Sequence, residues 1–283
     1  MEVLYFAVVI GALYWMRRTR KTRWPFSRED KLLRGPGERL RRRLIEIDEQ
    51  FIWELLAGVT LPMVAAASAA KAAQVVGLGN TAILSIGLGS GLAVIGVSAG
   101  RVVRLASQRA DHLLGWFGER VVGEQLQLAT VHGWRVFHDV PSATGNVDHI
   151  AVGLGGVFAI ETKARSKLGR KSSGVDHIAY FDGRDLVWHR TKDNRGLDQA
   201  EQNALWVMKW IKDEIGERVH ASPILALPGW WLELTPARGT RLCRVVNPKW
   251  LPDLLAKERP VLPQRLVDLI ALRLEARCRD VED

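Results

Sequence analysis

Residues 146–163 of the chain read NVDHIAVGLGGVFAIETK. Two short apolar runs flank a glycine-rich turn, and this pattern predicts a β-hairpin. If the loop is formed by residues 154–155, the register sets Asp148 opposite Glu161. Directly opposed residues lie on one face of the sheet, with Cβ atoms roughly 4.5–5.5 Å apart. The stretch therefore predicts two neighbouring carboxylates at the open end of a hairpin.

These opposed carboxylates repel each other unless something neutralises them. A divalent cation such as Mg²⁺ would do so, because hard cations bind carboxylate oxygens. Lys163 follows Glu161 by two residues, so its side chain lies on the same face. Taken alone, the residues favour a structural alternative, because ion-pair networks also gather charge. In that alternative Asp148, Glu161 and Lys163 form a cross-strand ladder with Asn146.

A series of short motifs surrounds this hairpin between about residue 115 and residue 210. In order along the chain they are Gly118-Glu119, Phe137-His138-Asp139-Val140, residues 147–153, residues 155–163, Gln199-Ala200 and Asn203-Ala204. The series resembles the nuclease-related domain (NERD) family of the restriction-endonuclease-like nucleases, whose core is Asp…(Glu/Asp)-x-Lys. The resemblance implies an α/β fold with a small mixed central sheet flanked by helices.

The resemblance also implies metal-dependent hydrolysis of phosphodiester bonds in nucleic acid, with DNA as the expected substrate and Mg²⁺ or Mn²⁺ as the cofactor. Asp148 and Glu161 would bind the metal, with the Thr162 carbonyl as a third ligand. Lys163 would orient or deprotonate the attacking water, or stabilise charge on the phosphate.

Two helical residues join this predicted site through the same resemblance. Glu119 would complete the metal site through water, and Gln199 would hydrogen-bond the attacking water or a phosphate. The alternatives are a solvated helix charge for Glu119 and a surface amide for Gln199.

A basic segment follows the predicted site directly. Its cations are Lys163, Arg165, Lys167, Arg170 and Lys171, and residues 163–171 contain no acid. A loop of this kind can bind phosphates, and each such contact weakens with salt. The alternative is a solvated loop.

Other residues are assigned no chemistry. His149 points away from Asp148 across the strand, so we expect it to pack in the core. Cys243 and Cys278 lack metal-ligand spacing, and we expect no disulfide between them. No small-molecule cofactor motif is evident, because the glycines of residues 87–91 follow no strand and precede no Gly-Lys-Ser/Thr.

The charge of the chain is concentrated near its beginning. Residues 17–43 carry twelve Lys or Arg and three Asp or Glu, which equals the whole net charge of +9. This run follows the apolar residues 3–16, so it indicates membrane topology and anionic lipid rather than DNA binding by the rest of the chain. Residues 3–16 predict a short membrane span whose C-terminal end is cytoplasmic. Their length is marginal against the roughly 20 residues that a span needs, and the alternative is an interfacial or packed helix.

Between residues 55 and 100 the only ionisable residue is Lys71. This length predicts two spans, at about 53–70 and 82–100, and the alternative is a buried helical pair in a soluble protein. Residues 38–51 have helical periodicity, which favours a basic helix on the membrane surface or a solvated helix. The excess of arginine on both sides of the hairpin predicts that everything from residue 101 onward is cytoplasmic.

We therefore divide the chain into a membrane anchor, residues 1–110 with a basic juxtamembrane stretch at 17–50, and a cytoplasmic nuclease domain, residues 111–283. In the domain we expect helices at 112–129, 197–215, 248–257 and 263–277, strands at 134–139, 223–227 and 242–246, and a second hairpin at 180–190. The leading hypothesis is a membrane-anchored nuclease. The alternatives are a non-catalytic nucleic-acid-binding or regulatory module and a membrane scaffold, and the oligomeric state stays open.

Overall fold

The computed structural model describes residue 11 and residues 32–143, 145–167, 177–188, 191–235, 239 and 241–281. Three predictions therefore lie outside the described residues. They are the span at 3–16, the first part of the basic stretch at 17–31, and the basic loop residues Arg170 and Lys171.

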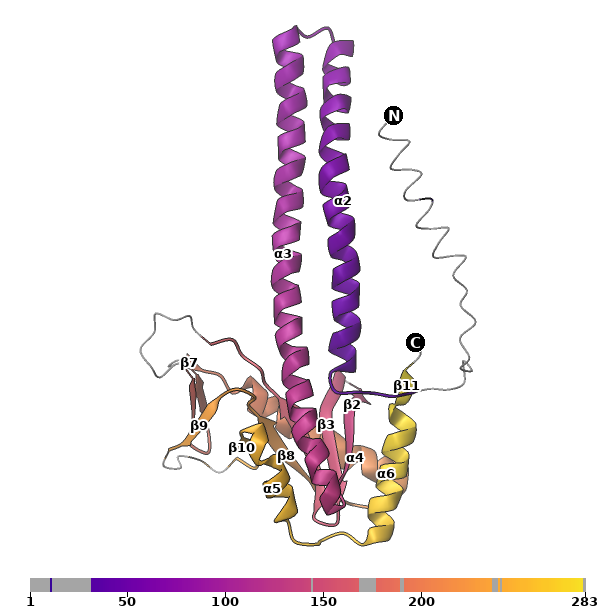
Figure 1. Cartoon of the computed structure of the whole chain (residues 1–283), viewed down its shortest axis with the longest axis vertical. Helices are drawn as coiled ribbons and strands as arrows, with labels where there is room; N and C mark the ends of the chain where they lie inside the picture. The colour runs from indigo at the N-terminus through magenta and orange to yellow at the C-terminus, as the bar shows by residue number, and fades with distance from the viewer. Residues whose placement is uncertain are drawn as a thin grey trace.

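Two long antiparallel helices project from an α/β domain (Figure 1). They are α2, Glu38–Val75, and α3, Asn80–Ala129. At 1.5 Å per residue they are about 57 and 75 Å long. Both are long and apolar enough to cross a membrane by length and composition alone. Small residues allow the helices to approach closely, since a Cβ on Gly87 would lie 3.1 Å from the Ala66 carbonyl oxygen.

The polar ends of these helices continue the apolar ones without a break. The helices predicted at 38–51 and 112–129 are real, but neither is a separate element. Ion pairs join the two polar halves, with Arg109 Nε 2.6 Å from Asp48 Oδ1 and Arg101 Nη1 3.4 Å from Glu54 Oε1. Residues 38–51 therefore pack along α3 as part of the hairpin, and their contact with a membrane surface stays a prediction.

The domain is built around a five-stranded sheet of order β10-β8-β4-β3-β2. Strands β2 (Arg135–Ser142), β3 (Gly145–Gly153) and β4 (Gly156–Thr162) are antiparallel, and β8 (Ala221–Ala226) and β10 (Arg244–Val246) continue parallel to β4. Gly153 pairs with Gly156 and His149 with Ile160, which confirms the predicted loop and register of the central hairpin.

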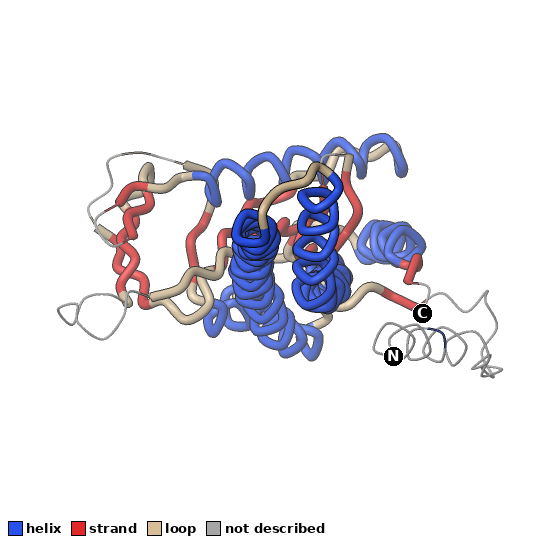
Figure 2. The backbone as a smooth tube through the Cα atoms, turned by 90° about the horizontal axis from the view of Figure 1, so that it is seen from above, coloured by secondary structure: helices blue, strands red, loops and turns tan. Residues whose placement is uncertain are grey.

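Helices cover both faces of this sheet (Figure 2). On one face α4 (Arg195–Ile215) and α6 (Gln264–Cys278) bury Val207 and Leu274 against Ile150 and its neighbours. On the other face the last turns of α3 and the short helix α5 (Leu251–Ala256) pack Leu126 and other apolar side chains against Phe158. This arrangement confirms a mixed α/β domain.

A smaller sheet of order β7-β6-β5-β9 lies beside the first. Its strands are β5 (Ile178–Phe181), β6 (Leu186–Trp188), β7 (Thr191–Lys192) and β9 (Trp231–Leu234). The hairpin predicted at 180–190 is β5-β6, closed by a turn in which Asp182 Oδ1 accepts hydrogen bonds from the main-chain N–H groups of Arg184 and Asp185.

A third pairing ties the start of the described chain to its end. Strand β1 (Leu32–Leu33) is antiparallel to β11 (Arg279–Val281), and Arg34 N donates to Cys278 O at 3.1 Å. The short 3₁₀ helices η1 (Thr130–His132) and η2 (Pro248–Trp250) complete the fold. Cys243 and Cys278 are both buried.

Candidate active site

The predicted site residues meet where the open end of the β3-β4 hairpin lies between α3 and α4. They line one cavity of about 820 Å³. The members that come from the prediction are Asp148, Glu161, Thr162, Lys163, Glu119 and Gln199. The fold thus brings together residues from two strands and two helices that the sequence places up to 80 positions apart.

Asp148 lies one residue beyond the last backbone pair of the hairpin, His149 with Ile160, and the same register sets it opposite Glu161. Its Oδ2 accepts a hydrogen bond from Thr162 N at 2.7 Å. Removal from water raises the pKa of Asp148 well above its usual range, and the charges of Glu161 and Glu119 add to this effect.

Glu161 is 2% exposed, and both of its oxygens have partners. Oε1 accepts from Lys163 Nζ at 3.2 Å, and Oε2 accepts from Asn203 Nδ2 at 2.9 Å. Lys163 Nζ also donates to Gln199 Oε1 at 2.9 Å. Burial raises the pKa of Glu161, and the Lys163 ammonium opposes that rise.

This pattern differs from the cross-strand ladder that was the structural alternative. The ion pair between Lys163 and Glu161 is present, but Asn146 donates to Asp139 Oδ1 at 2.7 Å. Asn146 lies opposite Pro141 in the sheet.

Glu119 reaches the cavity from α3 and is not a solvated helix charge. It is 8% exposed, and among the described residues its Oε2 has no hydrogen-bond partner. Burial raises its pKa to about 8, with the charges of Asp139 and Glu161 adding to the rise. Three carboxylates that resist ionisation therefore surround one cavity.

The basic segment after the site is only partly described. Arg165 forms an ion pair with Asp193 and lies over the Trp188 ring, 5.1 Å from its centroid. The pKa of Asp193 is lowered to about 2, chiefly by hydrogen bonds from Arg195 and also by Arg165. Lys167 is exposed. The charge of Arg165 is thus already balanced by an acid.

His149 is fully buried, as expected, but it is not alone. Its Nδ1 lies 2.8 Å from Nδ1 of His138, and the rings meet edge to face. Burial lowers the pKa of both imidazoles, that of His138 to about 4. The pair is a neutral hydrogen-bonded contact beneath the site.

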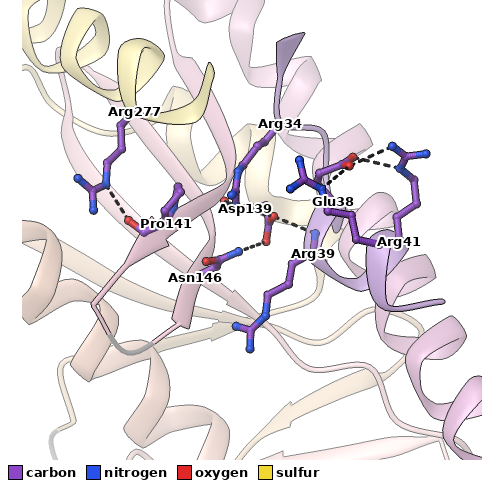
Figure 3. A network of polar contacts seen from close by, with 9 residues as sticks. Arg34, Glu38, Arg39, Arg41, Asp139, Pro141, Asn146 and Arg277 are labelled. Atoms are coloured by element: carbon purple, nitrogen blue, oxygen red, sulfur yellow. Dashed lines mark hydrogen bonds and ion pairs between the residues drawn. The ribbon is translucent and has the colours of Figure 1, made fainter. Parts of the chain in front are cut away.

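Arginines of residues 34–43, which comprise the loop before α2 and the first turns of that helix, also line the cavity, and the sequence alone does not indicate them. They are Arg34, Arg39, Arg42 and Arg43. Figure 3 shows how the segment is held: Asp139 accepts from Arg34 Nη1 at 3.0 Å and from Arg39 N at 2.9 Å. No local signal could reveal this contact, because it joins residues about a hundred positions apart in sequence.

Residues 114–228 match the family model described as the nuclease-related domain. The chain contains a nuclease-related domain. This family is restriction-endonuclease-like, and the matched segment includes every predicted catalytic and metal-binding residue. It leaves out the segment 34–43 that closes the cavity. Comparisons with curated proteins and with solved structures find no match.

Proposed function

We propose that this protein is a membrane-anchored nuclease that hydrolyses phosphodiester bonds of DNA with a divalent cation, Mg²⁺ or Mn²⁺. The observation that carries the proposal is the meeting of Asp148, Glu161 and Glu119 around one cavity with Lys163 among them. Structural ion pairs do not require three buried carboxylates with raised pKa values, whereas cation binding gives a reason for them.

The donor set fits such a cation. Among the described residues, no three His, Cys, Asp or Glu side chains are grouped so that they could hold a metal ion by themselves. Mg²⁺ does not need such a group, because it keeps several waters and is held by one or two carboxylates together with substrate phosphate. Asp148 and Glu161 would hold it with the Thr162 carbonyl, and the unpartnered Glu119 Oε2 would accept from a bound water. When bound, the cation supplies polarisation of a phosphoryl oxygen and an acidified water.

Lys163 and Gln199 have distinct tasks in this proposal. The ammonium of Lys163 donates to both Glu161 and Gln199, so two acceptors fix its position at the cavity. From there it stabilises the negative charge that develops on the phosphate in the transition state, and a donor fixed in place for that charge lowers the activation barrier. Gln199 positions Lys163 through its carbonyl oxygen, and we assign it no proton transfer.

We further propose that the apolar parts of α2 and α3 span the membrane, with the α/β domain in the cytoplasm as a restriction-endonuclease-like fold. Many apolar side chains of the hairpin are exposed to the surroundings, among them Val64, Leu88 and Leu92. Exposure of this kind is costly in water and matches contact with lipid. Arg101 and Arg104 follow the second apolar part, which favours the inside for that end.

The test is a cleavage assay with the full-length protein in detergent micelles. Single- and double-stranded DNA and RNA are incubated with Mg²⁺, Mn²⁺ or EDTA. We expect DNA cleavage with either cation and none in EDTA. Asp148→Asn and Glu161→Gln should abolish cleavage, whereas Glu124→Gln should not, because Glu124 lies on the exposed side of α3 and pairs with Arg120.

Cation binding is measured separately from cleavage. A ligand specific to the folded state stabilises it by about 2.7 kcal/mol at 100 times its Kd. Mg²⁺ should therefore raise the free energy of unfolding of the wild type and of Lys163→Ala, but not of Asp148→Asn. If the wild type binds DNA without cleaving it under every condition, the non-catalytic module takes the place of this proposal.

A further inference from the structure

We propose that Arg39 binds a phosphate of the substrate backbone, so that the helix leading to the membrane supplies one wall of the nuclease cleft. Arg39 is the second residue of α2 and lies outside the segment that matches the nuclease-related domain. The inference rests on the proposed function and concerns how the same site holds its substrate.

The position of Arg39 links two cavities. It lines the main cavity and a neighbouring one of about 370 Å³, which Asn146 and Gln199 also line. Its Nη1 would lie 3.2 Å from a Cβ built on Gly145, so the guanidinium reaches the start of β3. Figure 3 shows the side chain reaching away from Asp139 while the main-chain N–H of the same residue holds that carboxylate.

The Arg39 guanidinium forms no ion pair with a described residue, unlike the other arginines around the main cavity, although its charge acts at longer range to oppose the rise in the pKa of Asp139 that burial causes. Arg34 pairs with Asp139, Arg42 with Glu38 and Arg43 with Glu46. Within the described part of the chain, the Arg39 side chain is exposed and forms no ion pair or hydrogen bond. An exposed guanidinium beside a cavity is well suited to phosphate, whose oxygens it can bind in a bidentate manner.

The backbone around Arg39 is fixed by close packing. Gly37 has φ 72°, and a Cβ at that position would lie 2.8 Å from the Trp116 ring. A Cβ on Gly123 of α3 would lie 2.5 Å from Pro36. These approaches press residues 36–37 onto α3, and the hydrogen bond to Asp139 fixes the next turn. The main chain of Arg39 is therefore held in place before substrate arrives, so only the freedom of its side chain is lost on binding.

The shape of the site favours a chain as its substrate. A third cavity, of about 390 Å³, is lined by Lys163, Arg165 and Gln199. Gln199 lines all three cavities, so they open from one centre in different directions. A strand that places its scissile phosphate near Lys163 would extend toward Arg39 on one side. Arg39 would then bind a phosphate next to the scissile one.

The experiment compares binding by wild type, Arg39→Gln, Arg39→Lys and Arg41→Gln, each as the full-length protein in micelles. Arg41 is the matched control, since it carries the same charge on the same helix turn but does not line the cavity. The probe is a fluorescein-labelled single-stranded DNA oligonucleotide, followed by anisotropy with Ca²⁺ in place of Mg²⁺. Salt is varied between about 50 and 200 mM.

We expect Arg39→Gln to bind about tenfold more weakly, which corresponds to about 1.4 kcal/mol. The slope of log K against log salt should fall by about 0.7, the value for one phosphate contact on a single strand. Arg39→Lys should keep the slope and lose part of the affinity, and Arg41→Gln should match the wild type. In cleavage with Mg²⁺, Arg39→Gln should raise KM more than it lowers kcat.

The outcomes separate this inference from the proposed function. If the wild type binds and cleaves DNA and Arg39→Gln behaves as Arg41→Gln does, Arg39 binds no phosphate and the nuclease proposal stands. If the wild type neither binds nor cleaves nucleic acid, the proposed function fails and this inference fails with it. The urea midpoint of Arg39→Gln should lie close to that of the wild type, because the exposed side chain loses only a longer-range attraction to the Asp139 carboxylate.

Discussion

Asp139 should hold residues 34–39 onto the domain, and Asp139→Asn should release them. Asp139 is 3% exposed and adopts φ 49°, a conformation that asparagine tolerates. The substitution therefore avoids new backbone strain and removes only the charge. Arg34, whose side chain is 12% exposed, would lose the carboxylate that its Nη1 contacts at 3.0 Å.

Breaking a buried ion pair by removing one partner costs about 3–5 kcal/mol. We expect the lower end, about 3 kcal/mol, because the amide oxygen of the substituted side chain would still accept one hydrogen bond and because burial already raises the pKa of Asp139. With a slope of about 2 kcal/mol per M urea, the unfolding midpoint should fall by about 1.5 M. Fluorescence of the buried Trp188 and Trp230 follows the transition in micelles.

A double-mutant cycle tests the contact itself. Arg34→Gln and Asp139→Asn should show a coupling of more than about 1 kcal/mol, as contacting residues do. The control is Asp213→Asn, which removes an ion pair with Lys209 whose side chains are 55% and 74% exposed, and should change stability by less than about 0.5 kcal/mol. A change equally small for Asp139→Asn would refute the docking of this segment.

Three further predictions follow from burial and charge. Burial lowers the pKa of His138 to about 4, so the neutral imidazole contributes stability that is present above about pH 6.5 and lost as the pH falls toward 4. Urea unfolding at several pH values should show a loss of about 3 kcal/mol in the wild type and a smaller loss in His138→Gln. The pH dependence due to Glu119 has the opposite sign: its pKa is raised to about 8, so the free energy of unfolding without cation declines as the pH rises from about 4.5 to 8. In EDTA at pH 8, Glu119→Gln should therefore be more stable than the wild type. Cysteines introduced at Asn80 and Ser107 report topology, and an outside reagent should label the first alone; the reverse result would contradict the proposed orientation.

The central hairpin could be predicted from sequence because its signals are local. Glycines at both ends of a two-residue loop set the register, and the register sets Asp148 opposite Glu161. The positions of Glu119 and Gln199 beside the hairpin could not be predicted in this way. Nothing near either residue indicates that α3 and α4 meet the same strand ends, so only the family resemblance could join them to the site.

The continuity of α2 and α3 was missed for a physical reason. The helices predicted from sequence begin or end where apolar residues meet charged ones, near residues 51 and 100. A change in polarity does not end a helix; a helix ends where a residue breaks it or its last carbonyls are capped. The residues from Arg101 to Asp111 include no proline or glycine, so α3 continues into the domain.

This continuity joins the proposed anchor to the proposed active site. Glu119 lies on the same uninterrupted helix as the apolar residues before Gly100, and Arg39 lies on the same helix as those after Leu55. Glu119 lies nineteen positions after Gly100, which corresponds to about 28 Å along the helix. A flexible linker would let the domain sample many distances from a membrane. Two continuous helices joined by ion pairs at Asp48 and Glu54 keep the domain at one distance. If the apolar parts span the bilayer as proposed, the cleft stands at a fixed distance from it, and the rigid stalk that sets this distance also supplies residues from both of its helices to the cleft.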